Sequence, residues 1–233
     1  MNLTGSFRRP QIARTRTLPK PNIYILMLEN ELSDYAFNEE RAPFFKGLWR
    51  DVFKIDGQAP LDLEIGTGNG VHFQHYLKQH PTRNLLGIEL KYKPLIQTIR
   101  GAVRQGSFNG RVVRYHALNI DELFVPNEVD NVFVHFPDPW IAPRKPQNRV
   151  MNARVLNILF EIQRPGSFLE FKTDSREYFL WALEEIRRTK FKIELSTLDL
   201  HAEISEVPRL MTGFERIFVR KGVPINYLRL IKP

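Results

Sequence analysis

The chain has 233 residues, a formal net charge of +8 and no cysteine. This length suits one large α/β domain, and the absence of cysteine excludes disulfides, thiolate metal sites and a cysteine nucleophile, which also disfavours methylation of pyrimidine C5. We expect a cytoplasmic protein with a polyanionic partner, because the chain is basic and no apolar run predicts a membrane span or a secretory signal.

The first 22 residues are predicted to form a flexible basic arm. Residues 1–20 contain no acidic residue, and their basic residues are Arg8, Arg9, Arg14, Arg16 and Lys20. Such a segment can lie on phosphates or be solvated. Residues 23–233 are predicted to form a single domain. Its first part, residues 23–53, has a helical pattern that breaks near Pro43 and predicts one or two capping helices.

From Leu61 onward, short apolar runs alternate with amphipathic segments. The predicted strands are Leu61–Ile65, Leu85–Leu90, Arg111–Tyr115, Val129–Phe136, Ser167–Lys172, Phe191–Thr197 and Phe214–Arg220, with Ile225–Leu230 beside the last. Helices are predicted from the turn after Ile65 to about Gln79, and over Pro94–Gln105, Arg149–Gln163 and Glu177–Arg188. This alternation predicts an α/β fold: a mostly parallel, seven-stranded sheet with helices on both faces and an antiparallel strand near the C-terminus.

A strand that runs into a glycine-rich turn indicates a nucleoside site. Gly66, Gly68 and Gly70 follow the strand at 61–65 and let a ligand approach the backbone without meeting a Cβ. Glu89 ends the next predicted strand, where a carboxylate can accept hydrogen bonds from both hydroxyls of a ribose.

The spacing of these glycines distinguishes two cofactors. A dinucleotide site has the pattern G-x-G-x-x-G and holds a pyrophosphate at the helix N-terminus. This turn has G-x-G-x-G, and Glu64 lies two residues before the first glycine. A carboxylate there would repel a pyrophosphate but suits a cationic amino group or a sulfonium. We therefore predict S-adenosylmethionine rather than NAD.

A second motif, Phe136-Pro-Asp-Pro-Trp140, follows the strand at 129–136. Because strand carboxyl ends line the ligand crevice of an open α/β sheet, Asp138 and Trp140 should lie beside the methyl group of the donor. Trp140 offers a face on which a base can stack. Asp138 can accept hydrogen bonds from N1–H and the amino group of a guanine, or position the donor. The alternative is a rigid turn with a packed tryptophan.

These motifs resemble those of the bacterial tRNA (guanine-N7)-methyltransferases, a Rossmann-like class I methyltransferase family. The resemblance runs from about Phe37 to the C-terminus. It rests on Glu64-Ile-Gly-Thr-Gly-Asn-Gly70, Gly87-Ile-Glu89, Phe136-Pro-Asp-Pro-Trp140, and Lys172-Thr-Asp174 with Thr212-Gly-Phe-Glu215. It implies methyl transfer from S-adenosylmethionine to N7 of a guanine in the tRNA variable loop.

The resemblance also implies roles for individual residues. Asp138 would be the catalytic residue at the junction of donor and guanine. The implied cofactor-binding residues are Glu64, Gly66, Gly68, Gly70, Glu89 and Asp138. The implied substrate-binding residues are Trp140, Arg144, Asp174, Thr212, Gly213, Phe214 and Glu215. A further residue near the adenine is His116 by ungapped spacing, or Asn119 after a small shift; we favour Asn119.

The chain departs from the family pattern after Trp140. Ala142 stands where the family has a substrate-binding lysine, and Gly213 stands where lysine is common. The loop after Trp140 therefore offers less positive charge to tRNA, and the basic arm at 1–22 can compensate.

The reaction itself needs no general base. N7 of guanine has a lone pair and no proton, so the methyl group moves by direct in-line displacement. Proximity and orientation then supply most of the catalysis, which is worth about 7–11 kcal/mol. His72 and His75 are three residues apart, but no acid or cysteine completes a ligand set, so we interpret them as histidines on a helix surface and expect no metal.

Other functions stay open at this stage. The chain could methylate a guanine of another RNA or a small metabolite, or be a non-catalytic RNA-binding relative, which the missing lysine at Ala142 favours. An NAD-dependent oxidoreductase is disfavoured by the glycine spacing and by Glu64. We expect tRNA as partner and no membrane, with either a monomer or a homodimer.

Overall fold

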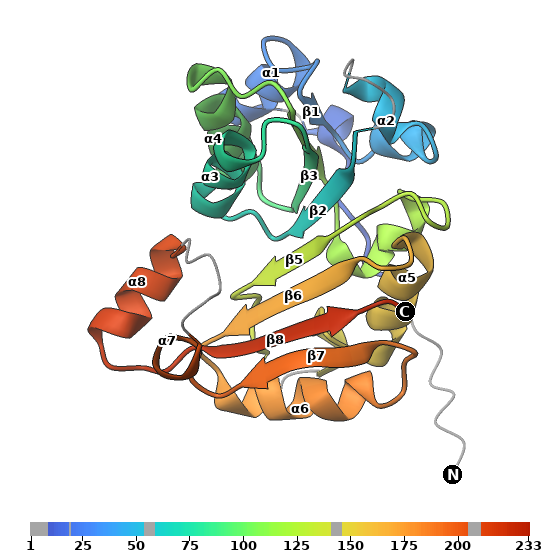
Figure 1. Cartoon of the computed structure of the whole chain (residues 1–233). Coiled ribbons are helices and arrows are strands. Elements are labelled where there is room, and N and C mark those ends of the chain that lie inside the picture. Colours follow the sequence, from blue (N-terminus) through green and yellow to red (C-terminus); the bar gives the residue numbers. More distant parts are fainter. Residues whose placement is uncertain (1–8, 19, 54–58, 141–145, 205–210) are drawn as a thin grey trace.

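The computed structural model describes residues 9–18, 20–53, 59–140, 146–204 and 211–233. Their strands form one eight-stranded sheet in the order β1-β4-β3-β2-β5-β6-β8-β7 (Figure 1). The strands are β1 (Ala36–Phe37), β2 (Leu61–Ile65), β3 (Asn84–Glu89), β4 (Gly110–Arg114), β5 (Val132–His135), β6 (Phe168–Thr173), β7 (Lys192–Thr197) and β8 (Asn226–Ile231). The α-helices are α1 (Ile23–Glu29), α2 (Trp49–Val52), α3 (Val71–Gln79), α4 (Tyr92–Arg104), α5 (Ala153–Ile162), α6 (Arg176–Ile186), α7 (Leu200–Glu203) and α8 (Gly213–Arg220). The 3₁₀ helices are η1 (Thr15–Thr17), η2 (Ala42–Phe45), η3 (Ala117–Glu122) and η4 (Pro146–Asn148).

The direction of the strands confirms the predicted sheet. Strands β1 to β6 pair in parallel, and β8 runs antiparallel to both β6 and β7. After β4 the chain crosses over to β5, which pairs with β2 on the side opposite to β3. An α/β sheet binds ligands at such a reversal of strand order, outside the carboxyl ends of the strands. The site is therefore expected after β2 and β5.

The prediction of a strand over Phe214–Arg220 is wrong, because these residues form α8. The Thr212 hydroxyl accepts a hydrogen bond from the Glu215 N–H at 3.1 Å, and the Glu215 carboxylate accepts one from the Thr212 N–H at 3.2 Å. This reciprocal capping box initiates a helix, and it overrides the strand preference of the aromatic and β-branched residues that follow. The strand predicted over Ile225–Leu230 is confirmed as β8, whereas the short edge strand β1 was not predicted.

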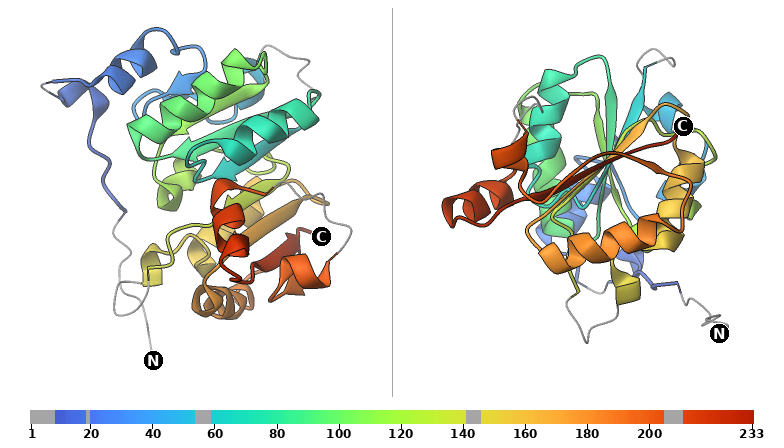
Figure 2. Two further views of the ribbon diagram at one scale, coloured as in Figure 1. Left: turned by 90° about the vertical axis from the view of Figure 1, so that its left-hand side faces the viewer. Right: turned by 60° about the horizontal axis from the view of Figure 1, so that its bottom comes forward.

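Helices cover the two faces of the sheet. Buried side chains of α1, α3 and α4 pack on β3 and β4 from one face, and those of α5 and α6 pack on the other face of the sheet, against β5 and β6 among others. Figure 2 shows the sheet nearly edge-on, with α3 and α8 on one side and α5 on the other. Every residue of β2 is buried, so the strand that leads into the glycine turn is held between two helical layers. Within the part of the chain that the structure describes, no helix has the length and apolar character needed to cross a bilayer.

The described part of the N-terminal segment is attached to the domain. Thr15 is buried, and its hydroxyl donates to Glu39 at 2.8 Å. The Arg114 guanidinium donates to the Ala13 carbonyl at 2.9 Å, and Arg9 forms an ion pair with Asp121 at 2.5 Å. Residues 1–8 lie outside the described residues, so the flexible arm and its boundary at residue 22 remain predictions.

Candidate active site

The turn between β2 and α3 has free space beside two of its glycines. Gly66, Gly68 and Gly70 have φ values of +81°, +53° and +78°, in the left-handed region that glycine tolerates. A Cβ added to Gly66 or Gly68 would meet no atom within 4 Å, whereas one on Gly70 would come within 2.7 Å of the Thr98 backbone. The turn is thus packed at its helix end and open at its strand end, which suits a bound ligand there.

Glu89 faces this open part of the turn. Its carboxylate accepts hydrogen bonds from the N–H groups of Gly68 at 3.2 Å and Lys91 at 2.9 Å. The Gly66 N–H donates to the carbonyl of Ile88 at 2.8 Å, which ties the turn to the end of β3. Glu89 is half-buried, so its carboxylate is held in place and remains accessible from the crevice.

Glu64 lies beneath the turn and is only 2% exposed. Its carboxylate lies 2.9 Å from Nδ1 of His72, which projects from α3 and is also buried. The interpretation of His72 as a surface histidine is therefore wrong. A buried carboxylate is costly unless it is hydrogen-bonded, so His72 fixes the orientation of Glu64 at the base of the turn.

A row of ionisable side chains continues from this pair across one face of the sheet. The rings of His72 and His135 are 4.5 Å apart at their centroids, and His135 Nε2 lies 2.8 Å from Glu170. Lys172 Nζ lies 3.4 Å from Glu215. We call this set the buried polar row: Glu64, His72, His135, Glu170, Lys172 and Glu215. It connects the base of the glycine turn with the first turn of α8.

Burial determines the charges in the middle of this row. It lowers the pKa of His135 to about 3, despite the opposing effect of Glu170, so this imidazole is neutral near pH 7. Burial alone would raise the pKa of Glu170, but the hydrogen bond from His135 and the charge of Lys172 lower it below its ordinary value. His135 therefore donates through Nε2 to an ionised Glu170, and its Nδ1 is buried with no hydrogen-bond partner among the described residues.

This arrangement predicts a loss of stability in acid. His135 stays neutral in the folded protein down to pH about 3, whereas in the unfolded chain it takes up a proton below its ordinary pKa of 6.5. The unfolded state then binds more protons, so the free energy of unfolding should fall by about 2 kcal/mol through His135 between about pH 7.5 and about pH 5. Urea unfolding at the two pH values measures this difference. His135→Gln should remove it and His75→Gln, at an exposed position, should retain it; an unchanged difference in His135→Gln would contradict the assignment.

The loop Phe136–Trp140 is strained at both ends and anchored from below. Phe136 and Trp140 have φ values of +50° and +40°, which are unfavourable for aromatic residues and recur at functional sites. Arg149 is 3% exposed and donates to the Pro139 carbonyl at 2.6 Å and to Glu177 at 2.7 Å. Asp138 and Trp140 are exposed, so the loop presents the carboxylate and the indole to solvent.

The first turn of α8 lies between the glycine turn and this loop. A Cβ added to Gly213 would lie 3.4 Å from Nδ2 of Asn69 in the glycine turn. The rings of Phe136 and Phe218 stack with centroids 5.9 Å apart. Glu215 is fully buried, and its carboxylate is engaged by Lys172, by the Thr212 N–H and by His201 at 3.0 Å.

Comparisons with known proteins place this geometry in a family. A family model described as "Putative methyltransferase" matches residues 58–228. A tRNA (guanine-N(7)-)-methyltransferase of Bdellovibrio bacteriovorus is 53% identical over 208 residues, which are 89% of this chain and 100% of that protein. The chain belongs to the tRNA (guanine-N7-)-methyltransferase family. A family member from Bacillus subtilis is 30% identical over 78% of this chain and 84% of its own length.

Solved structures support the fold of this family member. The chain matches a 30S ribosomal A1408 methyltransferase from an uncultured bacterium with a TM-score of 0.56 and 14% identity, over 85% of this chain and 99% of the other. It matches a 16S rRNA (adenine(1408)-N(1))-methyltransferase from Catenulisporales acidiphilia with a TM-score of 0.55 and 15% identity, over 78% and 90% of the two chains. These matches and the family membership confirm a class I methyltransferase fold and an S-adenosylmethionine-dependent methyltransferase.

The two residues predicted for the adenine side, His116 and Asn119, lie just before η3 and within it. His116 Nδ1 accepts a hydrogen bond from the Leu118 N–H at 3.2 Å and caps η3. Asn119 Nδ2 donates to the Pro10 carbonyl at 3.0 Å, while its Oδ1 is buried with no hydrogen-bond partner among the described residues. The choice between His116 and Asn119 stays a prediction.

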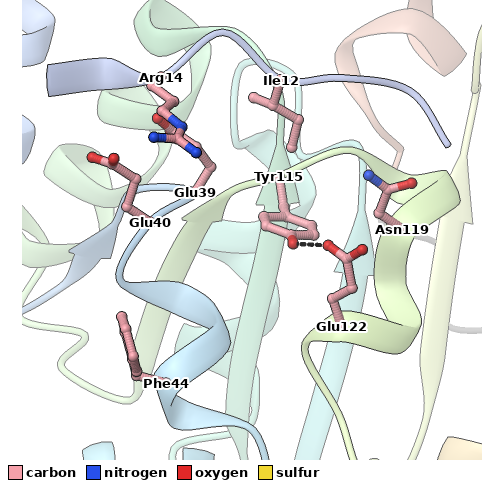
Figure 3. A pocket seen from close by; sticks show the side chains of 8 residues that line it. All are labelled: Ile12, Arg14, Glu39, Glu40, Phe44, Tyr115, Asn119 and Glu122. Carbon is pink, nitrogen blue, oxygen red and sulfur yellow. Dashed lines mark hydrogen bonds between the residues drawn. The ribbon is translucent and has the colours of Figure 1, made fainter. Parts of the chain in front are cut away.

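A cavity of about 570 Å³ lies between the N-terminal segment and this region (Figure 3). Its lining residues are Ile12, Arg14, Glu39, Glu40, Phe44, Tyr115, Asn119 and Glu122. Asn119 is the one predicted site residue among them, and Figure 3 shows the Tyr115 hydroxyl bonded to Glu122 across the floor. Neither Glu64, Glu89 nor Asp138 lines this cavity, so among the predicted donor-binding residues it adjoins only Asn119, on the adenine side.

The structure thus gathers most of the predicted residues at one edge of the sheet. Glu64 leads directly into the glycine turn, and the turn donates a hydrogen bond to Glu89 through the Gly68 N–H. Gly213 lies beside the same turn. Asp174 follows β6 and is partly exposed. Arg144 and Ala142 lie outside the described residues. Sequence reasoning did not assign roles to His72, His135 and Glu170, because nothing in their spacing shows that three separate elements bring them together.

Proposed function

We propose that this chain transfers a methyl group from S-adenosylmethionine to N7 of a guanine in tRNA. The observation that carries the proposal is the position of the Asp138 loop at the same sheet edge as the glycine turn, Glu64 and Glu89. Membership of the tRNA (guanine-N7-)-methyltransferase family supports tRNA as the substrate and N7 as the acceptor.

The donor would be held by the residues around the glycine turn. Glu89 has an accessible carboxylate that can accept hydrogen bonds from the ribose hydroxyls. Glu64 places a negative charge beneath the turn, where it favours the cationic amino acid end of the donor. When bound, S-adenosylmethionine supplies an electrophilic methyl group on a sulfonium.

Asp138 and Trp140 would hold the guanine. Their loop is stiffened by Pro137 and Pro139 and anchored by Arg149, so the exposed carboxylate and indole are pre-positioned. Asp138 can accept from N1–H and the amino group of the base, and Trp140 can stack on its face. No group has to remove a proton, because N7 attacks through a free lone pair.

The residues at the start of α8 would have two different roles, some positioning the helix and others contacting the nucleotide. Thr212 and Glu215 form the capping box and are buried, so we infer that they position the helix, with Gly213 beside the glycine turn. Phe214 and Asp174 are accessible and are the ones we expect to contact the nucleotide. We further propose that the protein acts in the cytoplasm; a monomer and a homodimer both remain compatible with this function.

Incubation of unfractionated tRNA with methyl-labelled S-adenosylmethionine, followed by digestion to nucleosides, tests the proposal. The label is expected in N7-methylguanosine, and mapping of the modified tRNA is expected to place it in the variable loop. Ribosomal RNA and free guanosine serve as alternative acceptors. Label in another nucleoside, or in the alternative acceptors only, would overturn the proposal, as would the absence of any transfer.

A further inference from the structure

The exposed side of α8 has an unusual composition for a surface helix. Its exposed side chains are Phe214, Arg216, Ile217, Val219 and Arg220, followed by Lys221. The helix contains one acidic residue, Glu215, and that residue is fully buried. The accessible surface of the helix is therefore basic and apolar, without a carboxylate.

The spacing orders these side chains into two neighbouring rows. Arg216 and Arg220 are four residues apart and form a basic row, and Phe214 and Ile217 are three residues apart and form an apolar row that ends at Lys221. Phe214 is 58% exposed and Ile217 48% exposed. An apolar row beside a basic row matches a nucleic acid strand, which has stacking bases on one side and phosphates on the other.

The position of α8 connects these rows to the active site. The capping box fixes the start of the helix, and Gly213 in its first turn lies beside Asn69 of the glycine turn. Phe218 stacks on Phe136, the first residue of the Asp138 loop. In Figure 1 the arrowheads of β5 and β6 point toward α8, which projects from that edge of the sheet. A strand that leaves the Asp138 loop in this direction would pass along α8.

We propose that α8 is a docking helix for the tRNA strand beside the target guanine, with Arg216, Arg220 and Lys221 on phosphates and Phe214 and Ile217 against bases. This inference rests on the proposed function. Charge favours RNA over a second copy of this chain as the partner of α8. The basic row would repel a second copy, which has a net charge of +8, and would attract RNA. The arginines of α8 would also supply positive charge in place of the lysine that is missing at Ala142.

Two variants and a matched control test the docking helix. Arg216→Gln with Arg220→Gln removes the basic row, and Phe214→Ala removes the exposed ring. Arg187→Gln with Arg188→Gln removes two exposed arginines after α6, a helix on the opposite face of the sheet from α8. For each protein we would measure circular dichroism, the Kd for S-adenosylmethionine by calorimetry, the Kd for tRNA at several salt concentrations, and KM and kcat for tRNA.

The α8 variants should weaken tRNA binding and raise the KM for tRNA about tenfold each, with an unchanged Kd for S-adenosylmethionine. The arginine variant should also reduce the slope of log K against log salt by about 1.4–1.8, since each of the two lost phosphate contacts contributes about 0.7–0.9. The α6 control should match the wild type in tRNA affinity and in salt slope.

Unchanged tRNA binding and an unchanged salt slope in folded α8 variants would overturn this inference alone. A wild-type dimer that is lost in Phe214→Ala would instead assign the surface to a second copy of the chain. Wild-type protein that binds tRNA through α8 without methylating it would overturn the proposed function and leave the docking helix standing.

Discussion

Asp138→Ala should reduce kcat/KM for tRNA methylation by about 10²–10³-fold while the protein stays folded and still binds S-adenosylmethionine. Asp138 is exposed, and its carboxylate makes no hydrogen bond or ion pair with another described residue, so its removal leaves no buried group unsatisfied. The loop keeps its geometry because Arg149 holds the Pro139 carbonyl. The loss should therefore arise in the orientation of the guanine and the donor.

Asp138→Asn separates charge from hydrogen bonding, because it keeps the shape and one acceptor oxygen. If the carboxylate accepts from both N1–H and the amino group, the asparagine variant should be nearly as slow as the alanine variant. Asp34→Ala, at another exposed aspartate, is the control and should be fully active. A wild-type kcat/KM in Asp138→Ala, measured with labelled donor over a range of tRNA concentrations, would remove Asp138 from the mechanism.

Much of the fold follows from patterns within single segments. The buried strand β2, the glycine turn and the helix α3 were predictable, because apolar runs and glycines are local signals. The Phe214–Arg220 segment was not read correctly, although Thr212 and Glu215 have the spacing of a capping box. Its aromatic and β-branched residues favour a strand, and the cap decides the outcome. Strand β1 has only two residues and depends on its pairing with β4, which no local pattern reveals.

The candidate site was predictable where the residues belong to one motif. Glu64, Glu89 and Asp138 lie at or just after the carboxyl ends of parallel strands, and that placement alone brings them to one edge of the sheet. The buried polar row was not predictable, since its members come from β2, α3, β5, β6 and α8 and pair only through tertiary packing. In the sequence, His72 cannot be distinguished from the exposed His75 on the same helix.

Glu64→Gln should weaken S-adenosylmethionine binding about 10- to 100-fold, because a hydrogen bond to a charged group contributes about 1.5–3 kcal/mol. Calorimetry with the donor alone measures this loss independently of tRNA. The KM for tRNA should change little, since Glu64 lies beneath the glycine turn rather than on the exposed Asp138 loop. An unchanged affinity for the donor would place the cationic end of S-adenosylmethionine elsewhere and would leave Glu64 as a structural partner of His72.

His72→Phe decides whether the histidine acts through Glu64. Phenylalanine fills a similar space next to His135 and Phe133 but makes no hydrogen bond, so the Glu64 carboxylate loses the partner that orients it. We expect about tenfold weaker donor binding. His75→Phe is the control, because His75 is exposed and lies three residues further along α3. In a double-mutant cycle, His72→Phe should add almost nothing to Glu64→Gln, because a positioning residue has no effect once the group it positions is gone. Fully additive losses would mean that His72 contributes to packing of α3 on the sheet and has no separate part in holding the methyl donor.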